Sequence, residues 1–98
     1  MDDGKKGGSS ENRRKRLLFR AQRRGFKEVD LIFGAYAQVA LAGMDETSLD
    51  QFEALLIAPD QEVYDWLRGA VVVPAEHDNA VFAGLKAVLG RKDTKWNA

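Results

Sequence analysis

Apolar residues recur at intervals of three and four along most of the chain, the spacing that places them on one face of a helix. The strongest stretch runs from about Phe26 to about Ala42 and is apolar on nearly every side. A helix of this kind must be covered by neighbours over most of its surface, so we expect it to be the central element of a small core. Its predicted core positions are Val29, Ile32, Phe33, Tyr36, Val39 and Ala40, with Leu31 and Ala35 widening the stripe.

Four further helices are predicted around this one. The first has a thin stripe of Leu17, Leu18 and Ala21 and is broken at Gly25. The third and fourth are separated by Pro59, which ends a helix, and Gly69 stops the fourth. In order, the five helices span about 11–23, 26–42, 45–58, 60–68 and 75–89.

Several polar residues are placed to cap these helices. Ser48 and Gln51 have the spacing of a capping box at the start of the third helix, and Asp60 is a plausible N-cap for the fourth. Trp66, in the fourth helix, is expected to pack into the core near the central helix. The run Val71-Val72-Val73 favours strand but has no second strand to pair with, so we interpret it as an extended connector that packs on the core.

The predicted fold is therefore all-α, a compact five-helix antiparallel bundle in a single domain over residues 11–90. Residues 1–10 are Gly, Ser, Lys and Asp for the most part and are expected to form a disordered polar tail, and residues 91–98 a frayed one. The longest apolar stretch, Leu31 to Met44, has 14 residues, whereas a membrane span needs about 20. We expect no membrane insertion.

Composition narrows the class of protein. The chain has 98 residues and no cysteine, so it has no disulfide and no thiolate nucleophile, and its N-terminus lacks the apolar segment of a secretory signal. A cytoplasmic monomer is the expectation. The net charge of zero divides sharply: up to Lys27 there are ten basic residues against three acidic ones, and from Glu28 onward five against twelve.

The basic run Arg13-Arg14-Lys15-Arg16 raises nucleic-acid binding as an alternative function, because clustered cations neutralise phosphates. We rank it second and expect no nucleic-acid partner, since the rest of the domain is acidic and few aromatic residues are interleaved for base stacking. A solvated basic helix face is an equally ordinary interpretation.

Residues suited to catalysis are few. His77 is the only histidine, and a lone imidazole in the first turn of a helix is usually solvated rather than a base or a ligand. Zinc has too few candidate ligands, and the segment Gly4 to Ser9 does not match a phosphate-binding loop. We therefore expect no catalytic residue, no metal site and no enzymatic activity.

Arg24, Gly25 and Glu28, followed by Asp30, form the pattern that stands out. If Arg24 and Glu28 were both helical, their spacing of four would place them on one face, where most such pairs are merely solvated. Gly25 at the start of a helix is costly relative to alanine and calls for a backbone or packing reason, such as the close approach of another protein's backbone.

The stretch from Arg13 to Gly69 resembles the small helical SdhE-type family of succinate dehydrogenase assembly factors, also called flavinylation factors. The resemblance rests on the RGxxE motif at Arg24, Gly25 and Glu28, the FExLL pattern at 52–56 and the WLxxG-like end at 66–69. Phe26 stands where Met or Leu is common in the family, and Val29 stands where Leu is common. Both residues keep an apolar character.

That resemblance implies an assembly factor rather than an enzyme. Members bind the flavoprotein subunit of succinate dehydrogenase, and in bacteria also fumarate reductase, and promote covalent attachment of FAD to that subunit. It implies that Arg24, Gly25, Glu28 and Asp30 form the partner-binding surface, with Gly25 admitting the client backbone and Arg24 and Glu28 offering charge-assisted hydrogen bonds. No dinucleotide-binding fingerprint is present, so we expect no tightly bound FAD.

Overall fold

The computed structural model describes the backbone of residues 2–95 and the side chains of residues 11–90, and this part of the chain is helical with no strand. The predicted all-α helical bundle is confirmed. The five α-helices are α1 (Asp2–Ala21), α2 (Lys27–Ala40), α3 (Glu46–Ile57), α4 (Asp60–Leu67) and α5 (Ala80–Lys95), and two short 3₁₀ turns are η1 (Leu41–Gly43) and η2 (Ala75–His77).

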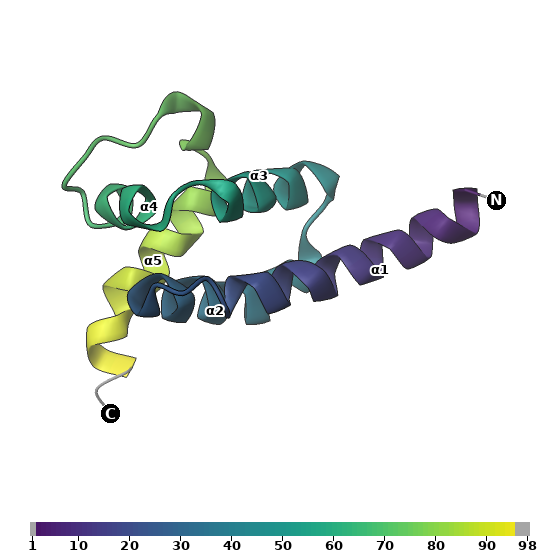
Figure 1. Ribbon diagram of the computed structural model, residues 1–98, viewed down its shortest axis with the longest axis horizontal. Coiled ribbons are helices and arrows are strands. Elements are labelled where there is room, and N and C mark those ends of the chain that lie inside the picture. Colours follow the sequence, from purple (N-terminus) through teal and green to yellow (C-terminus); the bar gives the residue numbers. More distant parts are fainter. Residues whose placement is uncertain (1, 96–98) are drawn as a thin grey trace.

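Four of the helices lie on two sides of the molecule, and α5 packs against helices of both sides. Figure 1 shows α1 and α2 along one side, α3 and α4 along the other, and α5 crossing behind both. Helix α2 packs against α1, α4 and α5, and α3 packs against α1 and α5. The central position predicted for the second helix is therefore confirmed.

The core is a single cluster to which every α-helix contributes. The prediction for α2 was too wide, however, because Val39 is 77% and Leu31 is 42% exposed. Helices α1, α4 and α5 cover most of α2 but leave one stripe to solvent. The largest fully buried side chains are Phe33, Phe52, Leu17, Ile32, Leu49, Leu55, Leu67, Leu85, Val29, Val63 and Val81.

A glycine in α5 leaves room for a side chain of α2. A Cβ at Gly84 would lie 2.4 Å from the ring of Tyr36, so the ring can occupy this position only because residue 84 has no side chain. Tyr36 is partly buried by this contact, which raises the pKa of its hydroxyl by desolvation. Its ring also lies 6.0 Å from that of Phe52, which links α2, α3 and α5.

Both ends of the bundle differ from the prediction. Helix α1 begins at Asp2 rather than near Glu11, so the backbone of 2–10 continues the helix where a disordered tail was expected, and in Figure 1 this part projects beyond the other helices. Helical hydrogen bonds lie within the segment and need no tertiary contact. Helix α5 likewise starts at Ala80 and passes Gly90 to reach Lys95. Residue 1 and residues 96–98 lie outside the described residues, together with the parts of both tail predictions that fall there.

Two of the predicted caps are replaced by neighbours. Asp45, not Ser48, is the N-cap of α3, and its carboxylate accepts a hydrogen bond of 2.8 Å from the backbone N–H of Ser48. This bond lowers the pKa of Asp45. Pro59 takes the N-cap position of α4 and leaves Asp60 as its first residue, where its carboxylate serves another purpose.

The connector before α5 was expected to pack on the core, but only its end does so. Val72 is 89% exposed, whereas Val73 contacts the core cluster. The prediction for His77 was wrong: it lies in η2, it is buried at 7% exposure, and its ring centroid is 5.3 Å from that of Trp66. Trp66 is buried as expected, with His77 as its ring partner.

Candidate functional site

The residues singled out by the sequence lie in the turn between α1 and α2. Gly25 has φ +99°, a left-handed conformation that other residues adopt only with strain, and this explains the glycine better than the helix start that was predicted. Gly25 is exposed, and a Cβ added to it would meet no atom within 4 Å. The backbone at this point therefore faces open space.

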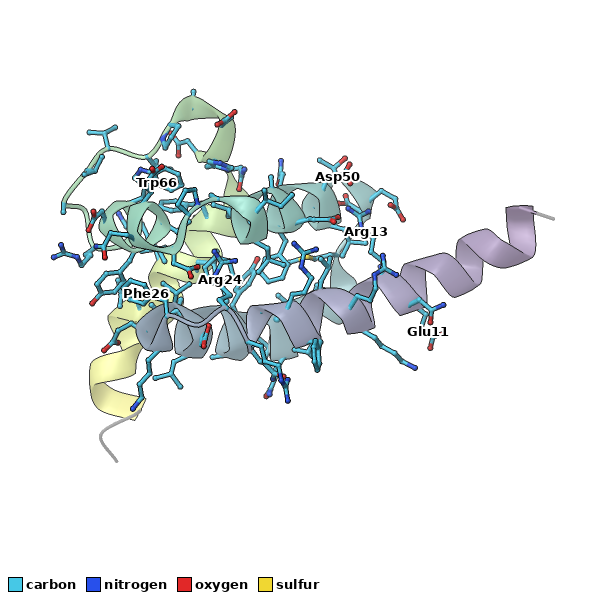
Figure 2. All side chains as sticks on the ribbon, viewed as in Figure 1. Glu11, Arg13, Arg24, Phe26, Asp50 and Trp66 are labelled. Atoms are coloured by element: carbon cyan, nitrogen blue, oxygen red, sulfur yellow. The ribbon has the colours of Figure 1, made fainter. Side chains whose placement is uncertain are left out.

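Arg24 points inward from this turn to the junction between α3 and α4 (Figure 2). Its guanidinium donates to the backbone carbonyls of Leu56 at 2.6 Å and Ala58 at 2.9 Å, and its Nε donates to Asp60 Oδ1 at 2.5 Å. The side chain is only 6% exposed and lies over the ring of Phe33. It thus satisfies carbonyls left without partners at the C-terminus of α3, where a cation is also favoured by the helix dipole.

Asp30 fixes the turn from the other side. Its carboxylate accepts from the backbone N–H of Arg24 at 2.8 Å through Oδ1 and from that of Gly25 at 3.3 Å through Oδ2. Both bonds reach from the first turn of α2 back to the turn that precedes it. The backbone around Gly25 is therefore held by side chains on both sides, Arg24 and Asp30.

The predicted partner-binding residues thus divide into two kinds. Arg24 lies outside α2, so the helical face expected for Arg24 and Glu28 does not form. The guanidinium is engaged within the domain, and the expectation that it offers hydrogen bonds to a client is not supported. Gly25 is at the surface and Glu28 is partly exposed in the first turn of α2.

Part of the basic surface of α1 is neutralised within the domain itself. Arg13 forms ion pairs with Glu46 at 3.1 Å and with Asp50 and Glu53 at 2.7 Å each, and Figure 2 shows it directed toward Asp50 on α3. Arg14 donates to two backbone carbonyls around η1. These contacts favour the interpretation of a self-neutralised helix face and disfavour the nucleic-acid alternative, because phosphate binding needs free cations.

The ion pairs of Arg13 also shift its own pKa and that of Glu53. Hydrogen bonds to Asp50 and then Glu53 raise the pKa of Arg13, and the hydrogen bond from Arg13 lowers the pKa of Glu53. Arg20, 3.4 Å from Glu53, adds to the second effect. Both pKa shifts show that the fold favours the charged forms of Arg13 and Glu53. The ion pair between them holds α1 against α3.

Sequence reasoning missed three residues of this framework. Asp60 was predicted to cap α4, and its pairing with Arg24 was missed. An arginine and an aspartate 36 positions apart carry no local signal of pairing. The burial of His77 had no local signal in the sequence either. Asn79 did carry a signal, because an Asn immediately before an apolar helical run is a recognisable N-cap. Its side chain accepts a hydrogen bond from the N–H of Phe82 at 3.0 Å.

The described residues contain no group of three or more His, Cys, Asp or Glu side chains that could hold a metal ion. Over the same residues, no helix is both long enough and apolar enough to cross a membrane.

The described residues form a small helical domain in which Arg24, Gly25 and Glu28 lie in and just after the turn between α1 and α2. The family described as the flavinator of succinate dehydrogenase matches residues 15–89, and the chain belongs to this family. The predicted resemblance is therefore confirmed over most of the chain.

Individual relatives are consistent with this family assignment. The chain is 32% identical over 71 residues to the mitochondrial succinate dehydrogenase assembly factor 2 of Dictyostelium discoideum, covering 72% of this chain and 50% of that protein. It is 39% identical over 64 residues to the FAD assembly factor SdhE of Acetobacter pasteurianus, covering 65% of this chain and 59% of that one. The matched region is thus about half the length of these relatives.

Proposed function

We propose that this protein is an assembly factor that binds the flavoprotein subunit of succinate dehydrogenase, and also that of fumarate reductase, and promotes covalent attachment of FAD to it. Membership of the flavinator family supports this proposal. The observation that carries it is the turn at Gly25, where an exposed stretch of backbone faces open space and is held in place by buried polar contacts.

The roles of the motif residues follow from that geometry. Gly25 admits the client's backbone, and Glu28, partly exposed one turn further on, contributes a charge-assisted hydrogen bond. Arg24 and Asp30 act as positioning residues, because they set the conformation of the turn from inside the domain. A rigid turn loses little conformational freedom on binding, which favours affinity.

The flavin chemistry belongs to the client in this proposal. The factor holds the client in a conformation that lets its own groups complete the bond to FAD, so it is not itself an enzyme. It acts as a monomer in the cytoplasm, binds FAD no more than transiently, and has no nucleic-acid partner. The absence of a dinucleotide-binding fingerprint from the sequence supports the statement about FAD.

Two glycines of the chain provide a matched test. Gly25 and Gly69 both have positive φ, at +99° and +80°, and a Cβ at either position would enter open space. Gly25→Ala and Gly69→Ala should therefore carry similar backbone strain and similar losses of stability. Only Gly25→Ala, and more strongly Gly25→Arg, should impair the client's flavinylation, because only that position contacts the client.

The measurement is covalent flavin on the client subunit, detected by in-gel fluorescence in a strain that lacks its own factor and expresses each variant. Glu28→Gln should weaken client binding by about 1.5 to 3 kcal/mol if its bond is charge-assisted. Equal flavinylation by Gly25→Arg and wild type, at equal levels of folded protein, would show that the turn is not the working surface.

A further inference from the structure

One surface of α1 is not explained by the turn at Gly25 or by the core. Arg16, Phe19 and Arg20 lie on one exposed face of α1, because Phe19 and Arg20 follow Arg16 by three and four positions. Arg23, in the turn after the helix, is also exposed and lies next to them, and we call these four residues the Phe19 surface. Phe19 is 57% exposed, although an aromatic ring of this size usually gains by burial. Its only ring contact among the described residues is the guanidinium of Arg23, which lies 4.2 Å from the ring centroid.

Two hollows border this ring. One, of about 360 Å³, is formed where α1 faces the α3–α4 junction, with Arg24, Pro59 and Asp60 opposite Phe19. The other, of about 330 Å³, is lined by Lys15, Arg16, Phe19 and Arg20. The first hollow has a fixed floor, because Arg24 is bonded to both the α3 end and Asp60.

The cations around Phe19 differ from the rest of the basic helix in their partners. Arg13 and Arg24 are paired with carboxylates, and Arg14 with carbonyls. Within the described residues, Lys15, Arg16 and Arg23 have no carboxylate partner, and Arg20 has a single one at 3.4 Å while 43% exposed. From residue 11 to the turn after α1, the basic side chains without a carboxylate partner are therefore gathered around the exposed ring.

We propose that the Phe19 surface binds an extended acidic segment of a partner protein, with apolar side chains seated in the hollows beside Phe19 and carboxylates paired with Arg16 and Arg23. Charge complementarity selects the acidic segment, and the two hollows that border the ring suit apolar side chains on an extended chain. Arginine and aromatic residues together are also the commonest anchors of protein interfaces.

A nucleic acid fits this surface less well. Few cations are free, so a phosphate backbone would gain little from counterion release. Among residues 11–90, Phe19 is also the only exposed aromatic ring, whereas single-stranded binding relies on several stacked bases.

The test uses the full chain and a fluorescein-labelled peptide in which Asp and Leu alternate, followed by fluorescence anisotropy at low salt. The peptide should bind saturably, and both Phe19→Ala and Arg23→Glu should weaken binding by about tenfold or more. Val72→Ala and Lys86→Glu alter exposed residues on other elements and should bind as wild type does. Phe19 is exposed, so circular dichroism should find the fold of Phe19→Ala unchanged.

A charge exchange makes the test specific. The double variant with Arg16→Glu and Arg23→Glu should reject the Asp–Leu peptide and prefer one in which Lys replaces Asp. The proposal is overturned if the Asp–Leu peptide fails to bind wild type, if Phe19→Ala binds it equally well, or if an oligouridine binds more tightly than the peptide. Because no flavoprotein is present, these results do not depend on the function proposed above.

Discussion

Two arginines of the same basic segment hold α1 and its turn to α3 in opposite ways. Arg13, with Glu46, Asp50 and Glu53, forms a cluster of carboxylate pairs at the surface, which we call the Arg13 cluster. Arg24 is 6% exposed and binds two carbonyls and one carboxylate at the α3–α4 junction, which we call the Arg24 junction. The same residue type thus supplies long-range charge at one site and a fixed hydrogen-bond geometry at the other.

The difference lies in the solvent around each guanidinium. At the Arg13 cluster the carboxylates of Glu46 and Asp50 are 70% and 71% exposed, so water and salt screen the attraction. At the Arg24 junction the guanidinium is dehydrated, and removing it would leave carbonyl groups and a carboxylate without partners. Similar distances therefore correspond to very different free energies.

The largest expected effect is at the Arg24 junction. Arg24→Ala should lower the free energy of unfolding by about 3 to 5 kcal/mol, because one member of a buried pair is removed. Arg24→Lys should recover only part of this, since an ammonium cannot donate in the planar fork that reaches Leu56, Ala58 and Asp60 together. Urea denaturation measures both, with Arg23→Ala as the neighbouring exposed control.

If Arg24→Ala were no less stable than Arg23→Ala, the contrast between the two sites would disappear. Arg24 would then be available to a client, as the sequence alone suggested.

Gly25→Ala is expected to rank next. A side chain at φ +99° should cost about 1 to 2 kcal/mol. Gly43→Ala is the control, because Gly43 has open space around it but no positive φ, and it should gain up to about 1 kcal/mol. Thermal or urea unfolding of both variants would expose an error if they shifted in the same direction.

A smaller effect is expected at the Arg13 cluster. Arg13→Ala should cost about 1 kcal/mol at low ionic strength, and about 1 M NaCl should remove most of the difference from wild type. The cost of Arg24→Ala should persist in the same salt. A salt response of equal size in the two variants would mean that burial does not separate the two sites.

The smallest effect concerns acid. The folded state lowers the pKa of Glu53 below its ordinary value of 4.5, so its contribution is fully present above that pH and is lost as the pH falls through the folded pKa. Glu53→Gln should therefore reduce the fall in Tm below about pH 4.5 and leave the pH dependence near neutrality unchanged. If the Tm of the variant fell as steeply in acid as that of wild type, other carboxylates would be responsible for the loss of stability.

Much of the fold could be predicted because its signals are local. The signals depend only on neighbouring residues and on backbone sterics: the apolar periodicity of α2 that includes Ile32 and Phe33, the helix stop at Gly69 and the helix break at Pro59. The motif at 24–30 could be located for the same reason. What a local pattern cannot contain is the identity of distant partners, and this is why the burial of His77 and the exposure of Val39 were not foreseen.

By itself, the sequence determined the number of helices, the family and the place of the turn between α1 and α2. Only the tertiary structure decided which way the motif faces. Arg24 turns inward because α3 ends next to it with unpaired carbonyls and α4 begins there with Asp60, partners 32 to 36 positions away that no local spacing predicts. Gly25 is left at the surface because the residues on either side, Arg24 and Asp30, hold its backbone from within.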